Sequence, residues 1–109
     1  AASGVADHIR FAAAAADASD NVKLHAVHVA TSAENVVRWT DEAKALARSA
    51  QFATRPGGAT ETAGRIYSLV EQIIGGTDAD GDGSISWTEG EGGLAQAAQH
   101  MGFMAQGEM

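Results

Sequence analysis

The strongest constraint on the fold is an apolar stripe with helical spacing that runs through the first 53 residues. When each residue advances by about 100° around a helix, one narrow side collects Phe11, Ala14, Ala18, Val22, His25, Val29, Ser32, Val36, Trp39, Ala43, Ala47 and Ala50. The opposite side carries charged residues, among them Lys23, Glu34 and Arg48. The stripe passes through Ser19 and Asp20, which resemble a helix cap, so one long helix or two helices broken near residue 20 would both fit. A single helix of about 45 residues would span roughly 65 Å, which favours the break.

Alanine supplies 24 of the 49 hydrophobic residues, and the chain has 109 residues in all. This length suits one domain with a small core. Because alanine forms helices well and fills little volume, the core must come from helices that pack closely. We therefore expect an all-α fold.

Glycine and proline divide the rest of the chain. Pro56, followed by Gly57 and Gly58, predicts the end of the first helical region, and Gly75 with Gly76 predicts the end of another helix. The prediction is a single domain over residues 1–109, a small bundle of three or four helices. The expected helices cover about 4–18, 20–53, 59–74 and 93–105.

The net charge of -7 is confined to the C-terminal part of the chain. Residues 1–65 contain seven acidic and seven basic side chains, whereas residues 66–109 contain seven acidic side chains and no Lys or Arg. An acidic region without a basic stripe argues against nucleic acids and anionic membranes as partners, and no apolar run is long enough for a membrane span. The absence of cysteine excludes disulfides and thiolate zinc sites. This distribution indicates a cation as the partner.

A second pattern lies between residues 78 and 89. Acidic residues occupy its first, third and fifth positions, glycine the sixth, an apolar residue the eighth and glutamate the twelfth: Asp78, Asp80, Asp82, Gly83, Ile85 and Glu89. This segment resembles the calcium-binding loop of the EF-hand family, here between the last two helices. The resemblance implies that calcium is held by Asp78, Asp80 and Asp82, the carbonyl of Ser84, a water on Ser86 and two oxygens of Glu89.

The flanks depart from the EF-hand pattern because glycines interrupt both sides of the loop. Glu89 is the expected closing ligand, and Ser86 with Glu89 would also form a capping box for the exit helix. A longer loop closed by Glu91 is the alternative. EF-hand loops usually occur in pairs, and this chain has one, so we expect a structural or buffering calcium site; the loop could also pair across a homodimer.

The four histidines suggest a second metal site. His25 and His28 lie one turn apart on the apolar stripe and could present two imidazoles to one ion. His8 could join them if the chain folds back, and so could His100 on the last helix. Such a set would suit zinc, copper, nickel or an axial contact to haem. The alternative is that His25 is buried and bonded to a backbone carbonyl or to Ser32.

These observations predict a calcium-binding protein without enzymatic activity, since no catalytic motif is found. Ala1, Ala2 and Ser3 resemble the small-residue side of a processing site. We therefore expect an exported, extracytoplasmic binding or assembly module, periplasmic or secreted, with a protein partner. The alternative function is a helical bundle that binds a transition metal or haem through its histidines.

Overall fold

Four helices and no strand make up the described part of the chain, residues 2–51 and 57–108 of the computed structural model. The helices are α1 (Ala2–Ala13), α2 (Asp20–Ala50), α3 (Gly58–Gly75) and α4 (Leu94–Gly107). The predicted all-α bundle is therefore confirmed. The predicted stop at Pro56 and the last two residues of the helix expected over 20–53 lie outside the described residues.

The chain breaks between α1 and α2, as the second of the two alternatives requires. α1 ends at Ala13, earlier than the expected residue 18, and turns lead to Ser19. The Ser19 side chain accepts a hydrogen bond from the Val22 N–H at 3.2 Å, which caps α2. Because α1 then folds back along α2, its buried face is not the continuation of the α2 stripe: Ala6 is buried, whereas Phe11 is 82% exposed.

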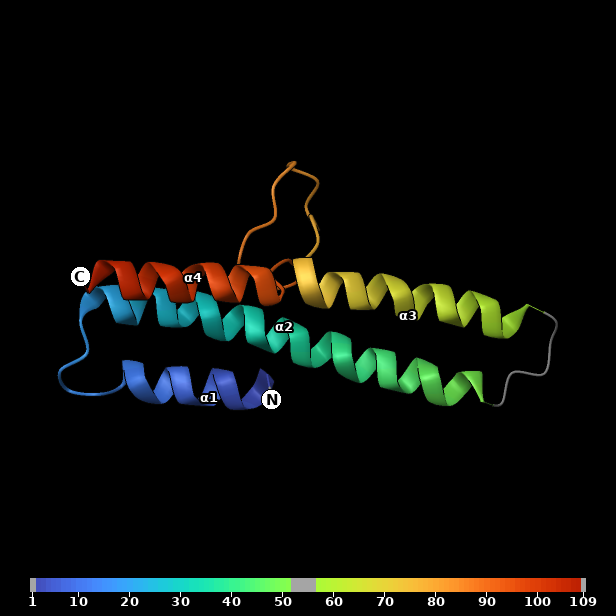
Figure 1. Ribbon diagram of the computed structural model, residues 1–109, viewed down its shortest axis with the longest axis horizontal. Helices are drawn as coiled ribbons and strands as arrows, with labels where there is room; N and C mark the ends of the chain where they lie inside the picture. Colours follow the sequence, from blue (N-terminus) through green and yellow to red (C-terminus); the bar gives the residue numbers. More distant parts are fainter. Residues whose placement is uncertain (1, 52–56, 109) are drawn as a thin grey trace.

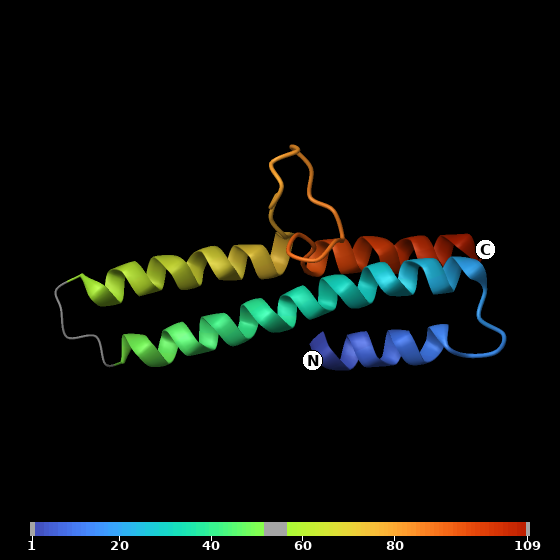
Figure 2. The ribbon, with the colours of Figure 1, turned by 180° about the vertical axis from the view of Figure 1, so that it is seen from behind.

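α2 is the central element of the bundle. α1 lies along its N-terminal half, while α3 and α4 lie end to end along another side (Figures 1 and 2). α3 follows the C-terminal half of α2 and α4 follows the N-terminal half, so the molecule is elongated, with extents of 58 × 29 × 18 Å. Among the described helices, α2 alone packs against all three others.

The core is small and consists largely of short side chains. Ala6 of α1 meets Ala30 and Ala33 of α2 in one buried cluster, and these methyl groups allow the two helices to approach closely. On the stripe of α2, Val29, Val36 and Trp39 are buried as predicted.

Several large apolar residues of α3 and α4 are exposed. Val70 and Ile74 of α3 are 43% and 59% exposed, and Leu94 and Met101 of α4 are each 47% exposed. The reason is the arrangement of the helices: α1 packs against neither α3 nor α4. Apart from their contact at the shared end, α3 and α4 therefore have one helical neighbour and bury one narrow face.

The alanine contact between α1 and α2 leads to a test of packing. We predict that Ala30→Leu destabilises the protein by about 1–3 kcal/mol, because a larger side chain forces α1 away from α2. Ala45→Leu, at an exposed position of the same helix, should change the stability by less than about 0.5 kcal/mol. Urea unfolding followed by circular dichroism measures both, and equal effects would contradict the close packing of α1.

Candidate metal centres

A long loop, residues 76–93, projects from the junction between α3 and α4 (Figure 1). Its base is closed by a hydrogen bond from the Thr77 N–H to the Glu91 carbonyl, at 2.9 Å. Gly76 ends α3 with φ of 76°, a conformation that favours glycine. At Gly92 a Cβ atom would lie 2.8 Å from the Cα of Trp87, so the chain between these two residues can turn back on itself only without a side chain at Gly92.

The three aspartates of the predicted calcium loop converge. Asp78, Asp80 and Asp82, the aspartate cluster, each place a carboxylate oxygen within 4.8 Å of the others. The Asp78 carboxylate accepts hydrogen bonds from the backbone N–H groups of Gly81, Asp82 and Gly83, the last at 2.8 Å. These backbone donors hold the Asp78 side chain toward the inside of the loop.

The charges of the aspartate cluster affect its members differently. The backbone N–H of Gly83 lowers the pKa of Asp78, helped by a hydrogen bond from Asp80. The backbone N–H of Asp82 lowers the pKa of Asp80, but loss of hydration, Asp78, and the negative charges of Asp82 and Glu91 outweigh it, so the pKa of Asp80 is raised. Residues 66–109 contain no Lys or Arg to offset the repulsion between these carboxylates.

Glu91, rather than Glu89, turns its carboxylate toward the aspartate cluster. Its side chain is only 4% exposed, and its Oε1 accepts hydrogen bonds from the backbone N–H of Ser86 at 3.0 Å and from the Ser86 hydroxyl at 3.2 Å. The Ser86 N–H is the main cause that lowers the pKa of Glu91, and hydrogen bonds with Asp80 also contribute. Glu89 is exposed.

The predicted capping box of Ser86 and Glu89 does not form, because α4 begins only at Leu94. Residues 88–91 form a turn, in which the Glu91 N–H donates to the Thr88 carbonyl at 3.0 Å. Gly93 is instead the N-cap of α4, and its N–H donates to Oε1 of Gln96 at 2.9 Å. The turn explains why the acidic side chain that faces inward comes two residues later than expected.

A buried asparagine of α2 fastens the end of the loop to the helices. Asn35, fully buried, donates to the carbonyls of Thr88 and Gly92 at 2.9 and 2.8 Å. Its Oδ1 accepts from the Gly90 N–H at 2.9 Å and from the Arg38 guanidinium. The sequence analysis missed this residue; the available signal was an uncharged polar side chain at the edge of the stripe, on the side of His28.

Three of the four histidines meet between α2 and α4. His25, His28 and His100, the histidine cluster, are half-buried and place a ring nitrogen within 4.8 Å of one another. The Nδ1 atom of His100 lies 3.2 Å from that of His25 and 3.1 Å from that of His28. His8 is exposed on α1 and does not belong to this group.

The surroundings of the histidine cluster favour neutral imidazoles. Burial lowers the pKa of His28, and nearby His100 and His25 lower it further. Burial likewise lowers the pKa of His100, together with the charge of His25. Neutral imidazole is the form that binds metal ions.

Trp87 connects the loop with the histidine cluster. Its indole stacks on the His28 ring, with centroids 4.0 Å apart and an interplanar angle of 19°. The Trp87 carbonyl accepts a hydrogen bond from the buried Ser32 hydroxyl at 3.1 Å. The base of the loop and the histidine cluster therefore contact the same face of α2.

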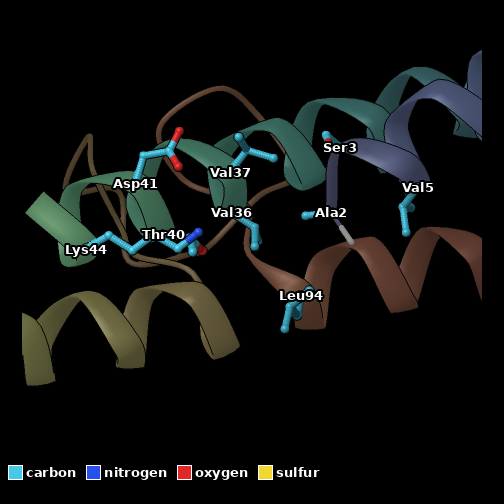
Figure 3. A pocket seen from close by; sticks show the side chains of 9 residues that line it. All are labelled: Ala2, Ser3, Val5, Val36, Val37, Thr40, Asp41, Lys44 and Leu94. Carbon is cyan, nitrogen blue, oxygen red and sulfur yellow. The ribbon is translucent and has the colours of Figure 1, made fainter.

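A hollow of about 420 Å³ lies elsewhere, where the beginnings of α1 and α4 approach the middle of α2 (Figure 3). Apolar side chains, including Val5, Val36 and Leu94, line much of it, with Asp41 and Lys44 at one end. Neither the aspartate cluster nor the histidine cluster lines it.

Comparison with protein-family models, with curated proteins and with solved structures finds no match to this chain. Within the described residues, no helix combines the length and apolar character needed to cross a bilayer.

The Asn35 contacts lead to a test. We predict that Asn35→Ala destabilises the protein by about 2–4 kcal/mol, because three backbone groups at the base of the loop lose their buried partner. Urea unfolding measures the loss. Ser49→Ala is the control, since it removes a single hydroxyl from an exposed position of the same helix. An equal loss of stability in both variants would refute the anchoring role of Asn35.

Proposed function

We propose that this protein binds calcium in the loop between α3 and α4, as a structural or buffering site. The observation that carries the proposal is the convergence of three aspartate carboxylates in the segment that resembles an EF-hand loop. Calcium prefers six to eight oxygen ligands in a flexible cage, and this loop offers carboxylate, hydroxyl and backbone oxygens.

The electrostatics of the loop support the same role. The carboxylates of the aspartate cluster and Glu91 repel one another, and the negative charges of Asp82 and Glu91 add to the loss of hydration and the Asp78 contact that raise the pKa of Asp80. A bound Ca²⁺ would offset the repulsion between these carboxylates. Binding would thus couple to order in the loop.

We propose Glu91 as the residue that closes the site, in a loop two residues longer than the EF-hand pattern. Its buried carboxylate is hydrogen-bonded to Ser86 and close to Asp80, whereas Glu89 is exposed. Asn35 holds the turn that brings Glu91 into this position.

A site fastened to a helix at its base suits a structural role better than a sensor that opens on binding. We propose a non-catalytic binding or assembly module. In the exported location that we expect, calcium sites of modest affinity are useful.

Calcium should stabilise the folded protein. We predict that free calcium at 100 times the dissociation constant adds about 2.7 kcal/mol to the free energy of unfolding, or roughly 10–20 °C to the melting temperature. Thermal melts with calcium and with a chelator measure the shift. Asp78→Ala should abolish it, and an unchanged midpoint in the wild-type protein would contradict the coupling.

A matched pair of variants distinguishes the two closing ligands. We predict that Glu91→Gln weakens calcium binding by about tenfold or more, a loss of about 1.4 kcal/mol, because an amide removes one charged oxygen ligand. Glu89→Gln should change the affinity by less than about threefold, since it alters only an exposed charge. Isothermal titration with CaCl₂ gives both constants, and the reverse order would assign the shorter loop.

A further inference from the structure

We infer that the histidine cluster is a second metal site, which takes a divalent late transition ion such as Zn²⁺ or Cu²⁺. This site goes beyond the calcium loop, because its donors are three imidazole nitrogens and no oxygen. Two of the ligands come from α2 and the third from α4.

The spacing of the ring nitrogens fits a single ion. Zinc binds histidine nitrogen at about 2.0–2.1 Å, and tetrahedral angles then place two ligand nitrogens about 3.3 Å apart. The Nδ1 atom of His100 lies 3.2 and 3.1 Å from those of His25 and His28. An ion could therefore be accommodated with small movements of the side chains.

Hydrogen bonding alone does not satisfy this arrangement. A neutral imidazole carries one N–H and one lone pair on different nitrogens. If Nδ1 of His100 is unprotonated, its single lone pair faces two neighbours; if it carries the proton, it can point that proton well at only one of them. One cation that accepts the lone pairs of His25, His28 and His100 together resolves the conflict.

Aromatic neighbours hold the rings in place. Trp87 stacks on His28, and Phe103 packs against His25 and His100 with ring centroids 5.5 and 5.1 Å away. Rings fixed in this way lose little freedom when an ion binds.

The donor set also selects the ion. Imidazole suits zinc, copper and nickel, whereas calcium prefers oxygen. Three protein ligands leave a fourth position for water or an external ligand. A porphyrin cannot enter between nitrogens 3.1–3.2 Å apart, so the cluster favours an ion over haem.

The test is a metal titration of the full chain after removal of bound metal with a chelator. Zn²⁺ and, separately, Cu²⁺ are added in competition with a chromogenic chelator, with calcium present to fill the loop. We expect one ion per chain, and Cu²⁺ to bind more tightly than Zn²⁺. His100→Ala should weaken binding by at least about 100-fold, more than the loss of a supporting residue usually does.

His8→Ala is the matched control, because His8 is an exposed histidine outside the cluster; its affinity should equal that of the wild type. Circular dichroism checks that each variant keeps its helices. If His100→Ala loses them, His25→Gln provides a second variant that lacks one ligand. Equal affinity in wild-type and folded ligand variants would overturn the site.

Asp78→Ala separates this inference from the proposed function. It should remove calcium binding and leave the Cu²⁺ and Zn²⁺ affinities within about threefold. Loss of the transition ion in Asp78→Ala, with His100→Ala unaffected, would place that ion in the loop and overturn the histidine site. Failure of calcium binding with an intact histidine site would overturn only the proposed function.

Trp87 gives an independent readout of the bound ion. Cu²⁺ on the histidine cluster should quench the fluorescence of Trp87, whose ring stacks on His28. Trp87→Phe keeps an aromatic neighbour and should lose most of the quenching while retaining the affinity. Electron paramagnetic resonance of the Cu²⁺ form should show splitting from nitrogen ligands, and a spectrum from oxygen ligands alone would contradict the assignment.

Discussion

The amide of Asn35 is the contact on which the position of the loop depends. It lies fully buried in the central helix and satisfies two carbonyls and one N–H group of the segment between Thr88 and Gly92. Because the backbone of a turn has few internal hydrogen bonds, a partner from outside must supply the rest. This contact fixes the position of residues 88–91. As a result, the Glu91 carboxylate faces the aspartate cluster.

One face of α2 supports both the histidine cluster and the loop that carries the aspartate cluster. His25, His28, Ser32 and Asn35 follow one another at intervals of three or four residues, so a single helical face carries two members of the histidine cluster and two anchors of the loop. Trp87 lies between them, stacked on His28 and hydrogen-bonded through its carbonyl to Ser32. The two clusters are therefore positioned by the same helix.

The sequence predicted the helical class and the acidic loop because both rest on patterns of neighbouring residues. It could not predict that Phe11 and Ile74 stay exposed, since periodicity identifies one face of a helix but not how many helices cover it. The sequence did not identify Asn35, because a polar residue at the edge of a stripe resembles a surface residue unless the position of its hydrogen-bond partners is known. The spacing of His25 and His28 predicted two ligands, whereas the position of His100 depends on how α4 lies against α2, which no local pattern contains.

The hydrogen bond between Thr77 and Glu91 bears on how easily the loop can change in length during evolution. It joins the two ends of the loop next to the helices. The outer arm, residues 78–85, is therefore a loop whose ends are already held together by the helical bundle. In polymer terms, doubling the length of a flexible excursion costs only about 0.6 kcal/mol of closure entropy. The arm can thus be lengthened, shortened or exchanged during evolution at little cost to the stability of the helices.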